Sequence, residues 1–253
     1  MTDNVLAAEE RAGALWLTLS RPPVNVLDLA TLRQIETLIR PSTRRRDLKA
    51  LVLRSAIPGT FSAGVDVRDH ARERVPEMLE TFHGLLRLLL ELPQVTVAAV
   101  DGRCLGGACE LVASCDIVVA SEGSTFGQPE IDLGCFPPFA CALLPRLIGR
   151  AAHALILGGA PVSAQEAERI GLITSVVPDP VAEAGAWAER LAAKSGAALA
   201  LARRALRAGS EGPLWDAVGR AERIYREELA ATHDMEEGVR AFLEKRRPVW
   251  KDR

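Results

Sequence analysis

Two glutamates, Glu110 and Glu130, are the residues of this chain whose type and surroundings point most directly to chemistry. Glu110 follows a glycine pair and precedes an apolar run at 111–113, so a helix starting near Gly107 would carry its carboxyl group among apolar neighbours. A carboxyl group in such a place needs a functional reason. Two nearby carboxyl groups in an apolar pocket would titrate as a pair and could transfer protons. The alternative is that Glu110 pairs with a core group and Glu130 lies at the surface.

The glycine pair before Glu110 offers a second chemical possibility. The first N–H groups of a helix lack intrahelical partners and point toward incoming negative charge. Gly106 and Gly107 therefore favour a site for a developing anion at the start of this helix. The alternative is that the glycines only permit close packing of a strand against a helix.

The elements that would position these residues alternate along the chain. Apolar runs predict strands, periodic runs predict helices, and Ser163 with Glu166 predicts a helix cap. Such alternation indicates an α/β protein with right-handed crossovers and a sheet covered on both faces. We expect strands at 15–19, 48–54, 95–100, 117–120 and 172–177, helices at 29–39 and 77–92, and helical structure from about 182 onward.

Composition restricts the class of protein. The chain has 253 residues, 48% of them hydrophobic, and a net charge of −2, so we expect a globular protein without general attraction for nucleic acid or anionic membranes. Five cysteines in apolar surroundings fit reduced thiols in a cytoplasmic protein. No apolar stretch predicts secretion or membrane spanning. The basic run at 44–46 is expected to be a solvated loop.

Five segments in order resemble the enoyl-CoA hydratase/isomerase family, the crotonases. They are 21–27 (RPPVNVL), 61–66 (FSAGVD), 105–110 (LGGACE), 126–130 (FGQPE) and 241–246 (AFLEKR). The resemblance runs almost end to end. It implies a crotonase-type spiral of ββα turns at 1–195, which holds the acyl-CoA site, and a C-terminal helical region at 196–253 used in trimer contacts. A homotrimer or a dimer of trimers is the implied assembly.

By this resemblance, the backbone N–H groups of Val65 and Gly107 form an oxyanion hole for a thioester carbonyl. Such a device stabilises an enolate-like oxygen by about 2.7 to 4 kcal/mol per donor in other enzymes. The resemblance also places the coenzyme A portion of the substrate along the chain, with the nucleotide near the C-terminal region of this or a neighbouring subunit. The implied contacts are Val24, Ala63, Gly64, Val65, Asp66, Gly106, Phe242 and Lys245. The alternatives are that Lys245 is a solvated helix residue and that Asp66 caps a following helix.

Glu110 and Glu130 match the two carboxylates with which hydratases of the family hold and activate water. One carboxylate acts as base toward the water and the other supplies a proton to the α-carbon. Family isomerases work with a carboxylate at the Glu130 position alone, so both acids favour hydration. The alternatives are a Δ3-Δ2 enoyl-CoA isomerase and a non-catalytic member that binds acyl-CoA or RNA.

One segment departs from the common hydratase pattern. Many family hydratases have a glycine-rich stretch after the second glutamate, whereas this chain reads GCFPPFAC at 134–141. Phe136, Pro137 and Phe139 are therefore expected to shape the acyl pocket differently. The Phe-Pro-Pro run at 136–138, together with 22–27 (PPVNVL), resembles cyclohexa-1,5-diene-1-carbonyl-CoA hydratases. The alternative is that Phe136 and Phe139 are ordinary core residues.

The remaining polar residues give no sign of a cofactor. The four histidines do not cluster as metal ligands, and each is interpreted as a surface or satisfied polar residue: His70, His83, His153 and His233. No phosphate loop, dinucleotide fingerprint or serine triad stands out. The sequence therefore predicts an enoyl-CoA hydratase with no metal or redox cofactor, in which coenzyme A is part of the substrate.

Overall fold

The computed structural model describes residues 5–209 and 214–253. Its larger sheet has six strands in the order β1-β2-β3-β5-β7-β10. The first pair is antiparallel and every later pair is parallel. The strands are β1 (Leu6–Arg11), β2 (Ala14–Leu19), β3 (Ala50–Ser55), β5 (Val95–Val100), β7 (Ile117–Ala120) and β10 (Ser175–Val176).

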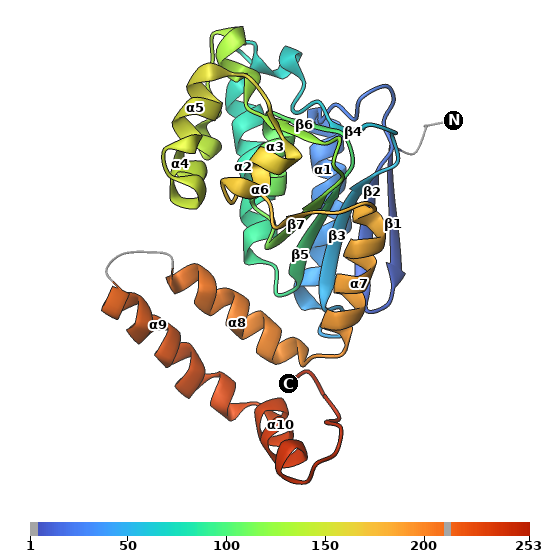
Figure 1. Ribbon diagram of the computed structural model, residues 1–253, viewed down its shortest axis with the longest axis vertical. Helices are drawn as coiled ribbons and strands as arrows, with labels where there is room; N and C mark the ends of the chain where they lie inside the picture. The colour runs from blue at the N-terminus through green and yellow to red at the C-terminus, as the bar shows by residue number, and fades with distance from the viewer. Residues whose placement is uncertain (1–4, 210–213) are drawn as a thin grey trace.

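Helices cover both faces of this sheet, as the apolar strands predicted (Figure 1). On one face lie α1 (Leu29–Ile39), α2 (Val75–Glu91) and α3 (Gly107–Ala113). On the other face, α7 (Pro180–Ala192) packs its alanines against Trp16, Val52 and Val97. The predicted cap at Ser163 is present: its Oγ accepts a hydrogen bond from the Glu166 N–H at 3.2 Å and begins α6 (Ala164–Arg169). Asp179 caps α7 in the same way.

A second, smaller sheet stands beside the first, and its individual strands were not predicted from the sequence pattern. From β3 to β8 its strands alternate along the chain with those of the large sheet, so each of three successive turns contributes one strand to each sheet before the next helical element. This is the spiral that the family resemblance implied. The order is β4 (Thr60–Ser62), β6 (Arg103–Leu105), β8 (Thr125–Gly127) and β9 (Val162–Ser163).

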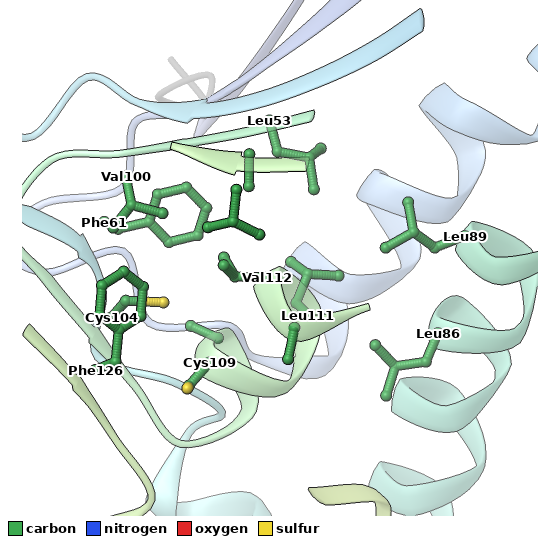
Figure 2. Packing of buried hydrophobic residues seen from close by; sticks show 14 of the residues in the cluster. Leu53, Phe61, Leu86, Leu89, Val100, Cys104, Cys109, Leu111, Val112 and Phe126 are labelled. Atoms are coloured by element: carbon green, nitrogen blue, oxygen red, sulfur yellow. The ribbon is translucent and has the colours of Figure 1, made fainter. Parts of the chain in front are cut away.

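The helix α3 is held inside this framework on all sides. Every one of its residues is buried. In Figure 2, Cys109 lies near Cys104 and Phe126 of the second sheet, and Leu111 faces Leu86 and Leu89 of α2. Because protein interiors are close-packed, a helix enclosed in this way has one position. Its polar residues are therefore carried at fixed places.

The remaining regular elements are helices. Short 3-10 turns and the remaining helices connect and follow the two sheets, and α8, α9 and α10 extend away from them (Figure 1). The described elements are η1 (Arg40–Arg44), η2 (Val67–His70), η3 (Pro129–Leu133), η4 (Leu229–Ala231), α4 (Pro138–Ile148), α5 (Ala151–Gly158), α8 (Gly196–Gly209), α9 (Leu214–Glu227) and α10 (His233–Leu243). No described helix is long and apolar enough to cross a membrane.

Candidate active site

Glu110 projects from the first turn of α3 into a site closed by the start of α4. The preceding Gly106 has φ of +55°, a conformation that glycine adopts without strain, and this turns the chain from β6 into the helix. Only 4% of Glu110 is exposed. Its Oε1 accepts a hydrogen bond from the N–H of Ala140 at 2.6 Å. The carboxyl group is thus buried and fixed by a backbone donor from another element.

Glu130 approaches the same place from η3, which begins with Pro129 after β8. It is 8% exposed, and its Oε1 lies 2.8 Å from the point where a Cβ on Gly106 would stand. With its amide nitrogen turned toward the acid, Gln128 donates to Glu130 Oε1 and Oε2 at 3.2 and 3.1 Å. Gln128 is itself fully buried, so it holds the carboxyl group in position.

Both acids border one cavity of about 420 Å³. Its walls come from four segments that are far apart in the sequence: the loop after β4, the helix α2, the start of α3, and η3 with the segment that follows it. The bordering residues are Ala63, Gly64, Val65, Val67, His70, Val75, Met78, Leu79, Phe82, His83, Gly106, Gly107, Glu110, Pro129, Glu130, Leu133, Gly134, Cys135, Phe136, Pro137 and Pro138.

Burial changes the protonation of both acids. It raises the pKa of Glu110 to about 7, with a smaller contribution from the negative charge of Glu130, while the Ala140 N–H acts in the opposite direction. Burial also raises the pKa of Glu130, against the hydrogen bond from its own backbone and the charge of His70. A carboxyl group whose pKa lies near 7 can both accept and donate a proton at neutral pH. The pair is therefore suited to proton transfer.

Two residues with backbone amides of interest, Val65 and Gly107, border the same cavity as these acids. A Cβ on Gly107 would stand 2.7 Å from Cγ2 of Val65, and one on Gly64 would stand 3.3 Å from the Gly107 nitrogen. The bridge between Leu27 and Val65 uses the N–H groups of Leu27 and Asp66. In the described part of the chain, no partner is found for the N–H groups of Val65 or Gly107. These amides are therefore available to a ligand.

The expected coenzyme A contacts fall into two groups. Ala63 and Gly64 border the cavity together with Val65 and Gly106, and the Ala63 N–H donates to the Val24 carbonyl at 2.9 Å. Asp66 does not border it. Its carboxylate caps η2 by accepting from the Arg68 N–H at 2.9 Å, as the alternative interpretation predicted.

The other expected contacts lie at the C-terminal end of the chain. Lys245 is exposed just after α10, which Figure 1 shows apart from α3 and α4. The side chain of Phe242 lies outside the described residues. Within the single chain, Lys245 therefore does not border the cavity.

The expected acyl-pocket residues also divide. Phe136 and Pro137 border the cavity, although 62% of Phe136 remains exposed. Phe139 was expected there and does not border it. It is the second residue of α4, which begins at Pro138, and its partly buried side chain packs against the hydrophobic core.

The sequence interpretation missed four contributors to the site: His70, His83, Gln128 and the N–H of Ala140. The two histidines were taken for surface or satisfied residues, yet both border the cavity. His70 follows the 61–66 segment closely, and Gln128 lies within the segment that contains Glu130, so both were within reach of motif reasoning. His83 and Ala140 were not, because the packing of α2 and α4 brings them in. Among the described residues, no group of three acids, histidines or cysteines could hold a metal ion.

Comparisons with known proteins agree with this geometry. Residues 9–253 match the family model described as enoyl-CoA hydratase/isomerase. A cyclohexa-1,5-dienecarbonyl-CoA hydratase from Thauera aromatica is 38% identical over 96% of this chain and 95% of its own length. A 2,3-dehydroadipyl-CoA hydratase from Escherichia coli is 33% identical over the full length of both chains.

Solved structures show the same fold. A crystal structure of an enoyl-CoA hydratase from Bacillus anthracis superposes with a TM-score of 0.93 at 30% identity, covering 99% of this chain and 100% of the other. The human enoyl-CoA hydratase domain-containing protein 3 gives a TM-score of 0.91 at 30% identity, over 98% and 100% of the two chains. The chain belongs to the enoyl-CoA hydratase/isomerase family.

Proposed function

We propose that this protein is an enoyl-CoA hydratase, which adds water reversibly across the double bond of an α,β-unsaturated acyl-CoA. The observation that carries the proposal is the convergence of Glu110 and Glu130 on one cavity, beside the free N–H groups of Val65 and Gly107. Several relatives of the chain carry the name hydratase. The reaction balances with water alone, so the proposed step needs no oxidant or reductant.

In the proposed mechanism, the thioester oxygen accepts hydrogen bonds from the Val65 and Gly107 amides. These bonds strengthen as negative charge develops on that oxygen, and such donors contribute about 2.7 to 4 kcal/mol each in other enzymes. One carboxyl group takes a proton from the water that attacks the β-carbon. The other gives a proton to the α-carbon. Isomerisation moves one proton and needs one acid, so the burial of both acids in the cavity favours hydration.

The acyl group that we propose is a cyclic dienoyl thioester. Two features support this substrate: the similarity to the Thauera aromatica protein and the segment Phe136 to Pro138, which borders the cavity. Prolines fix the backbone of this wall, and apolar side chains from α2 face it, including Met78 and Leu79. A flat apolar ring suits such a cavity better than a polar chain does.

An RNA-binding role has little support in the basic run at 44–46. Arg45 is paired on both sides, with Glu10 at 2.9 Å and with Asp47 at 2.5 Å. These acids neutralise the charge of Arg45, the central residue of the run, which would otherwise attract phosphate groups.

For the assembly, we propose a homotrimer or a dimer of trimers in which the C-terminal helices contact a neighbouring subunit. Large apolar side chains on these helices are exposed in the single chain, with Leu206 at 76% and Tyr225 at 51%. Lys245 and Phe242 of one subunit would then approach the nucleotide bound by the next. Exposed apolar residues on adjacent helices are typical of protein interfaces.

A substrate panel tests the proposed activity. Crotonyl-CoA and cyclohexa-1,5-diene-1-carbonyl-CoA are incubated in parallel with the purified protein, and loss of the conjugated enoyl thioester is followed by absorbance. We expect hydration of the cyclic substrate with a higher kcat/KM than that of the linear one. Preference for the linear thioester would reject the cyclic assignment alone. Absence of hydration across a panel of linear and cyclic enoyl thioesters would reject the hydratase function.

A further inference from the structure

Two histidines border the cavity, and the protein uses only one of them in its own hydrogen bonds. His70 Nδ1 is paired with the Asp66 carbonyl at 3.1 Å. The Nε2 of His83 is buried and has no hydrogen-bond partner in the described part of the chain, and no bond of its Nδ1 is found there either. A buried polar atom without a hydrogen-bond partner destabilises the folded protein. This cost suggests that His83 is kept for a ligand.

His83 stands at the reacting end of the cavity. The neighbouring Phe82 packs against α3, since its Cζ lies 3.2 Å from the place of a Cβ on Gly107. On its other side, the His83 ring centroid is 6.2 Å from that of Phe139. The next residue, Ala140, donates to Glu110. The imidazole therefore lies near the start of α4, whose Ala140 binds Glu110, and it borders the same cavity as Glu110.

The charge state of His83 suits a neutral partner. Burial lowers the pKa of the imidazole, and the positive charge of Arg87 lowers it further. A neutral imidazole presents one donor and one acceptor nitrogen. A half-turn about its Cβ–Cγ bond exchanges the positions of Nε2 and Cε1, so a ring nitrogen can turn to a ligand without backbone movement. The wall around it is apolar, with Val75 and Met78 from the same helix.

We propose that His83 is a specificity-determining residue, which hydrogen-bonds the hydroxyl group of a hydroxyacyl-CoA in this cavity. The proposal rests on the proposed hydratase function, because hydration places a new hydroxyl group on the acyl portion close to Glu110. A hydroxyl group both donates and accepts, which complements the two nitrogens of a neutral imidazole. His83 therefore distinguishes a hydroxylated acyl group from the same acyl group without the oxygen.

The test compares two pairs of ligands by calorimetry. The pairs are 3-hydroxybutanoyl-CoA with butanoyl-CoA, and 2-hydroxycyclohexane-1-carbonyl-CoA with cyclohexane-1-carbonyl-CoA. All proteins carry Glu130→Gln, so that turnover does not consume the hydroxylated ligand. With His83 present, we expect the hydroxylated member of at least one pair to bind roughly 3- to 10-fold more tightly, the range for one neutral hydrogen bond. His83→Leu should remove this preference and leave the affinity for the saturated ligand within about 2-fold.

Two further variants separate the hydrogen bond from packing. The amide of His83→Gln can donate and accept, so part of the preference should remain. His153→Leu is the matched control, since His153 is exposed on α5 and does not border the cavity. It should bind both ligands as the parent does. An unchanged preference in His83→Leu, or no preference for either hydroxylated ligand in the parent, would overturn the proposal.

An NMR measurement on the protein that keeps His83 tests the proposal even if the His83 variants do not fold. The nitrogen NMR signals of the His83 ring should move when the preferred hydroxylated ligand is added, and move less with its saturated partner. Equal responses to both ligands would contradict the proposal. Rapid turnover in the Glu130→Gln background would instead contradict the proposed roles of the acids, so the two failures are distinguishable.

Discussion

In the proposed mechanism, Glu110 serves catalysis at a cost to the stability of the protein. Its carboxyl group is 4% exposed and meets a single backbone donor, the Ala140 N–H. In an apolar enclosure the charged form is disfavoured, which raises the pKa of Glu110 to about 7. The same shift keeps a proton available near neutral pH. The properties that make this residue a useful acid therefore also make it an unfavourable core residue.

Replacing either acid with its amide should remove most of the activity. Glu110→Gln and Glu130→Gln keep the size of the side chain and remove proton transfer, which contributes about 10² to 10⁴-fold to rate. We expect kcat for enoyl-CoA hydration to fall by about this factor in each variant. Affinity for a saturated acyl-CoA should stay close to that of the parent. Hydration at the parental rate in either variant would contradict the proposed mechanism.

The cost of Glu110 to stability should appear as a dependence on pH. The carboxyl group is protonated more readily in the folded than in the unfolded protein, so its contribution is most favourable below pH 4.5 and is lost as pH rises through about 7. The full loss corresponds to about 3 kcal/mol. Glu110→Gln cannot ionise. We therefore expect the unfolding free energy of the variant minus that of the parent to increase between pH 5 and pH 8 in urea titrations. A difference that stays constant or decreases would contradict this explanation.

At the scale of elements, the sequence predicted the helices and strands that have long, regular apolar patterns. The helix α1 and the strands β5 and β7 lie at the predicted residues, because each has a continuous apolar pattern. The strands of the second sheet have two or three residues, too few to show alternation. The edge strand β1 was missed because five of its six residues are exposed and carry no apolar pattern.

The site residues that could be predicted were those inside recognisable sequence motifs. Glu110 and Glu130 were placed by their segments, and the structure brings both to one cavity. The orientation of Phe139 depends on α4 beginning at Pro138, and the position of His83 depends on how α2 packs against α4. Such tertiary contacts have no local signal. Sequence reasoning therefore identified the acids and missed part of the wall around them.

The loop between β4 and η2 should not tolerate a side chain at Gly64. Gly64 has a φ of +95°, and a Cβ on it would stand 2.7 Å from the Leu105 carbonyl oxygen and 3.3 Å from the Gly107 nitrogen. Gly64→Ala should therefore displace one or both proposed oxyanion donors and reduce kcat/KM by about 10²-fold or more.

Gly149→Ala provides the matched control for this loop. Gly149 also has a positive φ, +55°, but a Cβ there meets nothing within 4 Å. Both variants should lose about 1 to 3 kcal/mol of stability from backbone strain, measured by thermal unfolding, and Gly64→Ala should lose more because of its clash with the Leu105 carbonyl. Only Gly64→Ala should lose activity. Equal activity in the two variants would show that the approach of Gly64 to Gly107 has no catalytic role.

At the scale of the molecule, Arg203 joins the C-terminal helices to the rest of the chain. Its side chain is buried on α8 and donates to Asp116 Oδ2 at 2.5 Å. It also reaches the last carbonyls of α2, including Leu89 at 3.0 Å and Leu90 at 2.9 Å. These carbonyls have no partner within the helix. One guanidinium thus closes the end of α2 and fixes the direction in which α8 leaves the core.

Arg203→Lys should destabilise the protein although it keeps the charge. An ammonium group cannot reproduce the planar set of donors, so buried carbonyls lose their partners, at a cost of about 2 to 4 kcal/mol. The matched control is Arg204→Lys. Arg204 lies one position further along α8, where it forms an exposed pair with Glu228 that is worth little. Denaturant unfolding should separate the two variants, and equal stabilities would contradict this role of Arg203.

The proposed assembly can be tested through the exposed face of α8. Light scattering after gel filtration should give three or six times the chain mass of 27.2 kDa. Leu206 is 76% exposed on this helix, and a charge buried at a subunit contact is strongly unfavourable. Leu206→Glu should therefore shift the protein to lower mass at the same concentration. Ala7→Glu places the same charge on the exposed side of β1 and should leave the mass unchanged. A parent protein that runs as a monomer would contradict the proposed assembly, whereas an unaltered mass in Leu206→Glu would assign the contact to other residues.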